Sequence, residues 1–223
     1  MRMSNFWRAS RRMALGMGLA LALAPLAARA GAYDDFFHAV VMDNAHGVDR
    51  LLARGFDVNS RDEKGQPAML LAMREGSFKV AERLLQRPEL DLNALNFTRE
   101  NALMMAALQG HVEWMRRLID RGALLEKPSY APLHYAATGP ESAAVQLLLE
   151  RGAKVDPRAT NGNTPLMMAA RYGTEAAVAV LLLHGADVRL RNERDQTAAD
   201  FARSAGRDTL AQMLDERIAQ ASR

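Results

Sequence analysis

The side chains best suited to acid–base or metal chemistry in this 223-residue chain are five histidines. They are His38, His46, His111, His134 and His184. None belongs to an H-E-x-x-H pair, and the chain has no cysteine that could complete a zinc site. Imidazole can act as a general base or as a hydrogen-bonding group inside a fold. Their spacing matches no metal-binding motif, so we predict no metal site among them.

Paired acids and paired methionines offer little more chemistry. Asp34-Asp35 and Asp62-Glu63 stand beside turns, where solvated carboxylates are common. The pairs Met104-Met105 and Met167-Met168 suit gap-filling in a core better than copper binding. The sequence also lacks a G-x-S-x-G elbow, a P-loop and a dinucleotide fingerprint. We therefore predict no catalytic residues and no cofactor.

The elements that carry these side chains are clearest between residues 160 and 188. Asn161-Gly162 is typical of a hairpin turn, since both residue types tolerate positive φ. Thr164 and Pro165 suit the N-cap and the first helical position. A short apolar helix follows, and Gly173 is expected to end it in the left-handed conformation. A second apolar helix is expected to end at Gly185.

This unit recurs along the chain. When Gly162 is taken as the register mark, equivalent positions are separated by 33, 34, 30, 33 and 33 residues. The marks are Ala32, Gly65, Arg99, Ser129, Gly162 and Asp195. Leucine pairs stand 19 and 20 residues after four of them, and Leu118-Ile119 replaces the pair in the fifth. A helix pair of this size cannot bury its own apolar face, so neighbouring units must stack.

The pattern resembles the ankyrin repeat, whose period is about 33 residues. The string Pro132-Leu133-His134 carries the resemblance, together with the glycine and leucine positions. It covers roughly residues 33 to 220. It implies an all-α solenoid of helix-turn-helix units with short β-hairpin loops. The expected domain is 31–223, with repeats at 33–60 (N-terminal cap), 62–95, 96–125, 126–158, 159–191 and 192–220 (C-terminal cap).

Residues 1–30 differ in composition from the repeats that follow. Four arginines precede an apolar run of about twelve residues, shorter than the about 20 that span a bilayer as a helix. Ala28-Arg29-Ala30 then provides small residues for cleavage, so we predict a signal peptide cleaved after Ala30. An uncleaved membrane anchor is the alternative, and Arg11-Arg12 leaves twin-arginine export open. The expected location is the periplasm or the exterior.

Removal of this segment changes the charge. It holds five of the 29 basic residues and no acids, which leaves 24 basic and 26 acidic side chains and a net charge of −2. This balance gives no support to nucleic-acid binding, and we expect no membrane association after cleavage. Without cysteines the exported chain has no disulfides, so packing between repeats must stabilise it.

The resemblance also implies where a partner would bind. In ankyrin arrays the hairpin tips and the inner face of the first helices grip partners on a concave surface. The corresponding positions here are Lys64, Gln66, Arg74, Phe97, Glu100, Gln109, Tyr130, Asn163, Arg171, Tyr172 and Arg194. Phe97, Tyr130 and Tyr172 suggest an aromatic contact stripe, although rings that merely pad irregular loops are the alternative. Trp114 is expected to pack between repeats.

The resulting hypothesis is a non-enzymatic, exported, monomeric module that binds another protein. A narrower version is an accessory or inhibitor protein that regulates an exported enzyme. An enzyme or a metal carrier on a repeat scaffold, and a secreted effector, are further alternatives. The sequence alone does not name the partner.

Overall fold

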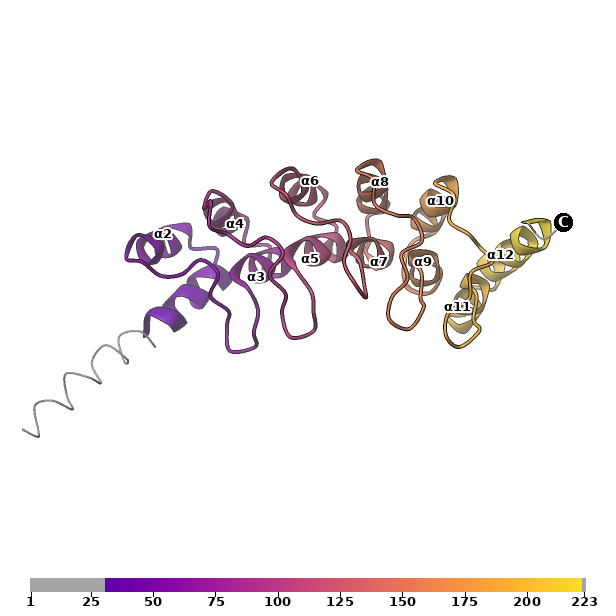
Figure 1. Ribbon diagram of the computed structural model, residues 1–223, viewed down its shortest axis with the longest axis horizontal. Coiled ribbons are helices and arrows are strands. Elements are labelled where there is room, and N and C mark those ends of the chain that lie inside the picture. The colour runs from indigo at the N-terminus through magenta and orange to yellow at the C-terminus, as the bar shows by residue number, and fades with distance from the viewer. Residues whose placement is uncertain (1–30, 222–223) are drawn as a thin grey trace, which may run out of the picture.

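The computed structural model describes residues 31–221, and there the chain is a row of helix pairs (Figure 1). The first pair is a helix over 31–41 followed by α2 (Ala45–Ala53). The next pairs are α3 (Ala68–Glu75) with α4 (Phe78–Leu85), α5 (Ala102–Gln109) with α6 (Val112–Asp120), and α7 (Pro132–Thr138) with α8 (Ser142–Glu150). The last are α9 (Pro165–Tyr172) with α10 (Glu175–Leu183), and α11 (Ala198–Ser204) with α12 (Asp208–Ala221). The predicted signal segment lies outside the described residues.

The helices form two rows. The inner row is α3, α5, α7, α9 and α11, each packed on the next, and the outer row runs beside it from α2 to α10 (Figure 1). The loops that precede the inner helices project from the inner row, and we call them the tips. The inner helices and the tips together form what we call the inner face. This arrangement confirms the predicted all-α solenoid.

The core runs continuously from one helix pair to the next. Alanines such as Ala106, Ala136 and Ala169 are fully buried on the inner helices, where their small size lets the helices approach closely. Leucines such as Leu84 and Leu148 fill the space beneath the outer helices. Because each pair buries its apolar side against both neighbours, stability depends on stacking between repeats.

Trp114 lies between two outer helices, as expected. Its ring stacks on that of Phe78 from the preceding outer helix, with centroids 5.6 Å apart and planes inclined by 19°. The guanidinium carbon of Arg117 stands 4.2 Å from the centre of the Trp114 ring. The tryptophan therefore joins repeats and is buried rather than offered to a partner.

Side chains cap several inner helices, and Thr164 does so at the predicted position. The Thr164 hydroxyl accepts a hydrogen bond from Met167 N at 3.4 Å, and Pro165 begins α9. The Asn101 side chain accepts from Met104 N at 3.0 Å and begins α5. Both caps satisfy an amide that the helix itself leaves without an acceptor.

Gly173 follows the last residue of α9, but the prediction that it takes the left-handed conformation is wrong. Gly185, after α10, has φ +85° as expected, but Gly173 has φ −89° and ψ −174°, which any residue can adopt. A Cβ at Gly173 would stand 2.1 Å from the carbonyl oxygen of Ala137 on α7. Gly173 is thus required for the close approach of two inner helices, and not for a left-handed turn.

The tips also differ from the predicted turn. Gly162 is left-handed, with φ +75°, but Asn161 is not. Gly162 N donates to Ala159 O at 2.8 Å, and Ala159 N donates to Asn163 O at 2.9 Å, so one left-handed residue closes the tip. The equivalent marks Arg99, Ser129 and Asp195 have positive φ without being glycine. Five of the six marks are therefore the one left-handed position of a tip, whereas Ala32 lies within the helix over 31–41.

Within residues 31–221 no helix combines the length and the apolar character needed to cross a membrane.

Candidate partner-binding site

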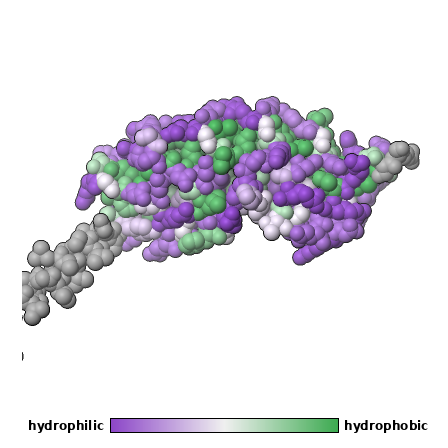
Figure 2. Space-filling model, viewed as in Figure 1, coloured by the Kyte–Doolittle hydropathy of each residue, from purple (hydrophilic) through white to green (hydrophobic). Residues whose placement is uncertain are grey.

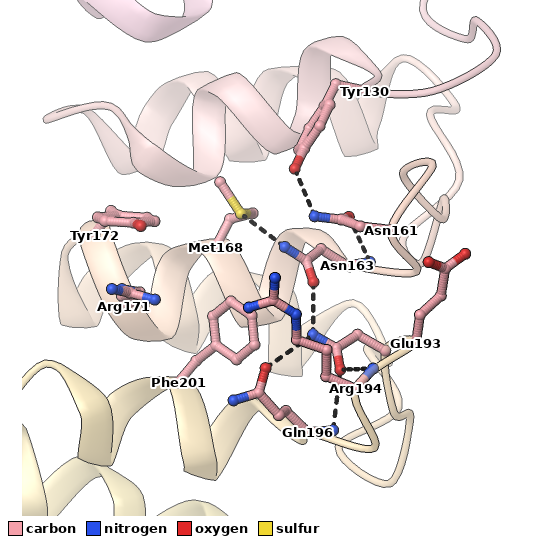
Figure 3. Close-up of a pocket in the computed structure, with 11 residues that line it drawn as sticks. Tyr130, Asn161, Asn163, Met168, Arg171, Tyr172, Glu193, Arg194, Gln196 and Phe201 are labelled. Carbon is pink, nitrogen blue, oxygen red and sulfur yellow. Dashed lines mark hydrogen bonds between the residues drawn. The ribbon is translucent and has the colours of Figure 1, made fainter.

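A pocket of about 370 Å³ opens on the inner face near its C-terminal end (Figure 3). It lies among α9, α11, the last two tips and Tyr130, the residue that directly precedes the N-cap of α7. Five of the eleven predicted contact residues line it, and they are Tyr130, Asn163, Arg171, Tyr172 and Arg194. Figure 2 shows hydrophilic side chains gathered over the tips at this end of the solenoid. The structure thus brings the C-terminal part of the predicted site together.

Amide side chains form one wall of this pocket. Asn192 Nδ2 donates to Asn163 Oδ1 at 2.9 Å, and Asn192 Oδ1 accepts from the backbone amides of Arg194 and Gln196. Asn161 Nδ2 donates to the hydroxyl oxygen of Tyr130 at 3.1 Å (Figure 3). These bonds connect successive tips, so the wall is formed before any partner arrives.

Two arginines supply the charge. The guanidinium carbon of Arg171 stands 5.1 Å from the centre of the Tyr172 ring, and both side chains are exposed. Within residues 31–221 the guanidinium groups of Arg171 and Arg194 form no hydrogen bond and no ion pair. The carboxylate of Glu193 is the acidic group of the lining. The pocket is therefore positively charged and offers unused hydrogen-bond donors.

Two of the three predicted residues of the second repeat, Gln66 and Arg74, are engaged within the chain. Gln66 is only 5 % exposed, and its Nε2 donates to Asp62 Oδ2 at 3.1 Å. Arg74 binds Gln66 Oε1 and forms an ion pair with Glu75 at 2.9 Å. The tip therefore buries Gln66 and leaves little of this predicted contact residue exposed to a partner.

Glu100 is satisfied in a similar way. Asn96 Nδ2 and Thr98 Oγ1 each donate to Glu100 Oε2 at 2.8 Å, and the Tyr135 hydroxyl donates to Oε1 at 3.0 Å. Burial alone would raise the pKa of this carboxyl, but the three hydrogen bonds outweigh it and lower the pKa. Glu100 is thus held ionised between two repeats, and its oxygens already have donors.

The aromatic residues do not form one stripe. Phe97 is 78 % exposed, yet its ring lies on the preceding tip, so a Cβ at Gly65 would stand 2.5 Å from Phe97 Cζ. Tyr130 and Tyr172 line the pocket, whereas Phe97 does not. Lys64 and Gln109 are exposed and also lie outside the pocket lining. Two of the three predicted aromatic residues, Tyr130 and Tyr172, thus share the pocket, while the ring of Phe97 packs on the preceding tip.

Six lining residues are absent from the eleven predicted contact residues, and they are Asn161, Met168, Asn192, Glu193, Gln196 and Phe201. A signal for Asn192 exists in the register. Asp62, Asn96 and Asn192 each stand three residues before a mark, and each side chain accepts backbone amides of its own tip. Their short polar side chains close the turns, as such residues commonly do. Nothing comparable points to Phe201.

His134 is held as a neutral imidazole. Its Nδ1 accepts from Ala131 N at 3.0 Å, so Nε2 carries the proton and donates to Asn163 O at 3.1 Å. Burial lowers the pKa of His134, and its backbone hydrogen bonds offset this only in part. In the described part of the chain, no group of three or more His, Cys, Asp or Glu side chains is placed to hold a metal ion.

Comparison with known families agrees with this architecture. A family model described as ankyrin repeats (3 copies) matches residues 36–128, 76–159 and 133–221. The chain belongs to the ankyrin-repeat family. Ankyrin repeats are protein–protein interaction modules, so the inner-face pocket of this ankyrin-repeat chain lies on a scaffold of the binding type.

The chain matches short parts of much longer curated relatives. The ankyrin repeat and KH domain-containing protein mask-1 of Caenorhabditis elegans is 31 % identical over 210 residues, which cover 82 % of this chain and 8 % of that protein. Human transient receptor potential cation channel subfamily A member 1 is 29 % identical over 195 residues, covering 82 % of this chain and 17 % of the channel. This ankyrin-repeat chain thus spans less than a fifth of either relative.

Solved structures match over nearly their whole length. A chain from the complex of the Bd0816 predatory endopeptidase from Bdellovibrio bacteriovorus with immunity protein Bd3460 superposes with a TM-score of 0.70, at 26 % identity, covering 82 % of this chain and 97 % of that one. An ankyrin repeat domain from Acinetobacter baumannii AYE gives a TM-score of 0.67 at 24 % identity, covering 81 % and 97 %. The second match supports the ankyrin-repeat fold alone.

Proposed function

We propose that this protein is a non-enzymatic, exported binding module that holds a partner protein against the C-terminal part of its inner face. The observation that carries the proposal is the pocket lined by Tyr130, Arg171, Tyr172 and Arg194. Its arginine guanidinium groups form no hydrogen bond and no ion pair within the described chain, and its tyrosine rings are accessible. Tyrosine and arginine are the residue types that contribute most to binding energy at protein interfaces.

The preformed wall supports the same proposal. Hydrogen bonds between successive tips hold Asn161, Asn163 and Asn192 in place. A surface that is already ordered loses little conformational entropy when a partner binds. Binding by a rigid face therefore suits a repeat scaffold better than binding by a loop that must first fold.

The partner can be tested by capture from the native host. The bait is the chain as its host produces it, beside a variant with Tyr130→Ala and Tyr172→Ala. Lys79→Ala, on the outer helix α4, serves as the matched control. We expect one protein to be retained by the parent and the control but lost by the double variant. Equal retention by all three would place binding elsewhere on the solenoid. A separate Phe97→Ala variant tests whether the ring outside the pocket contributes.

Export forms part of the proposal and rests on the predicted signal segment, residues 1–30. Mass spectrometry of the protein recovered from the periplasm or the medium tests it. An N-terminus at Gly31 supports cleavage after Ala30. A chain that keeps Met1 in the membrane fraction supports the uncleaved anchor instead.

A narrower candidate is an accessory or inhibitor protein for an exported enzyme. The match to a chain from the endopeptidase–immunity protein complex, at 26 % identity and over 97 % of that chain, favours it. If the captured partner is a hydrolase, its turnover is measured with increasing amounts of this protein. Loss of turnover at equimolar protein supports an inhibitor, and unchanged turnover supports a simple adaptor.

A further inference from the structure

The pocket on the inner face has more unused donors than acceptors. Gln196 Nε2 has no acceptor within residues 31–221, and the guanidinium groups of Arg171 and Arg194 have none either. Asn163 is 93 % buried, and its Nδ2 has only the thioether sulfur of Met168, at 3.9 Å. A thioether is a weak acceptor, so this amide also lacks a good partner. An occupant of the pocket must therefore bring acceptors.

The two arginines are unlike most others in the described chain. Arg117 pairs with Glu82 at 2.5 Å, Arg151 with Asp120 at 2.6 Å, and Arg203 with Asp215 at 2.6 Å. The residues after the predicted signal segment carry a net negative charge, yet these two arginines of one pocket form no ion pair, so they can bind an external anion. Guanidinium groups bind carboxylates with paired, charge-assisted hydrogen bonds.

The rest of the lining favours a peptide as the bearer of that charge. Tyr130, Tyr172 and Phe201 offer apolar surface next to the amides of Asn163 and Gln196. Such amides match the carbonyl groups of an extended backbone. Glu193, on the same lining, repels a second negative charge. The volume of about 370 Å³ lies within the range of about 300–1,000 Å³ typical of ligand pockets.

We propose that this pocket binds a segment of the partner protein through one carboxylate, held between Arg171 and Arg194. The carboxylate belongs either to an aspartate or glutamate side chain or to the C-terminus of the partner. Carbonyl oxygens of the segment accept from Asn163 and Gln196, and its apolar atoms pack on Tyr130 and Tyr172. In Figure 3, Arg171 and Tyr172 lie at one end of the pocket, and Arg194 reaches into it from the last tip. This inference rests on the proposed function.

Two displayed libraries of random eight-residue peptides distinguish the sources of the carboxylate. One library presents free C-termini, and the other fuses the random segment at both ends. Enrichment of a single aspartate or glutamate in both libraries indicates a side-chain carboxylate. Enrichment confined to free C-termini indicates the terminal carboxylate. Recovery of peptides without aspartate or glutamate from the library fused at both ends, or no enrichment in either library, would overturn the inference.

Fluorescence anisotropy with the recovered peptide, made synthetically, then tests the arginines. We expect Arg171→Gln and Arg194→Gln each to weaken binding at least tenfold. Replacing the peptide acid by its amide should cause a similar loss. Arg217→Gln, at an exposed arginine on α12 outside the pocket, serves as the matched control and should stay within twofold. Circular dichroism melts establish that the variants are folded. Unchanged peptide affinity in both Arg171→Gln and Arg194→Gln would refute the role of the arginines.

The inference and the proposed function fail in different ways. If the native partner is lost with Tyr130→Ala and Tyr172→Ala but kept with Arg171→Gln and Arg194→Gln, the inner face binds a protein without a bound carboxylate. If the tyrosine variant also keeps the partner, the proposed site itself is wrong.

Discussion

His134 Nε2 donates a hydrogen bond to the carbonyl oxygen of Asn163 at 3.1 Å, across the boundary between two repeats. His134 belongs to α7, and Asn163 belongs to the tip that precedes α9. Asn163 is also part of the pocket wall. One bond therefore contributes both to the stacking of the repeats and to the shape of the candidate site.

Protonation of this histidine should weaken the fold. Burial lowers the pKa of His134 in the folded chain below the unfolded value of about 6.5. Its contribution to stability is thus complete above that value and is lost as the pH falls towards and through the folded pKa. We expect the melting temperature to fall between pH 7 and pH 5, and His134→Gln to reduce that dependence.

His111 provides an internal comparison for this experiment. Burial lowers the pKa of His111 as well, so the variant with both His111→Gln and His134→Gln should show the flattest profile. His38→Gln, at an exposed histidine, is the matched control and should keep the parental profile. A His134→Gln profile parallel to that of the parent would contradict the assignment.

Substitution by asparagine should change the free energy of unfolding differently at Gly185 and at Gly173. Gly185 is left-handed with no atom near a Cβ, and asparagine tolerates that conformation. Gly185→Asn should therefore be mild, whereas Gly185→Val should destabilise by about 1–2 kcal/mol because a β-branched residue resists positive φ. Gly173→Asn should destabilise by about 1–3 kcal/mol or more, since its Cβ meets Ala137 O. Urea unfolding measures all three, and a mild Gly173→Asn would refute the steric account.

Arg207 closes the end of α9 from the next repeat. Its Nη1 lies 3.1, 3.0 and 2.9 Å from the carbonyl oxygens of Ala169, Ala170 and Gly173. Arg207→Met keeps most of the stem but removes these bonds, and should cost about 1.5–3 kcal/mol, the range for hydrogen bonds to charged groups. Hydrogen exchange should quicken in α11 and α12 first. Arg217→Met, at an exposed position of α12, should leave exchange unchanged.

Arg99 stands at a left-handed position with φ +65°. A residue other than glycine incurs a strain of about 1–2 kcal/mol in this conformation, and substitution by glycine removes it. Glycine also gives the unfolded chain more conformational entropy, which offsets about 0.5–1 kcal/mol of that gain. Arg99→Gly should therefore raise stability by about 0.5–1 kcal/mol. Arg99→Ala is the control for the loss of the side chain and should not stabilise. Equal thermal melts of the two variants would count against backbone strain at this mark.

Local patterns were sufficient to predict the helices and their register. Thr164 and Asn101 cap helices because a cap depends on residues within one turn of the chain. The marks Gly65, Arg99 and Gly162, found from the repeat spacing, coincide with the left-handed position of their tips. Tyr130, Arg171 and Arg194 were placed on one face because repeat period and surface position are linked in a solenoid.

The sequence by itself determined the all-α repeat fold, its caps and its register, since these follow from spacing within one unit and between units. Only the tertiary structure decided which predicted residues remain available. Gln66 and Glu100 are hydrogen-bonded to neighbouring side chains, while the guanidinium groups of Arg171 and Arg194 form no hydrogen bond or ion pair within the described residues. The close approach at Gly173 and the reach of Arg207 also depend on distances between residues about 35 apart in sequence. Such distances are set by how neighbouring repeats pack, which no spacing within one repeat specifies.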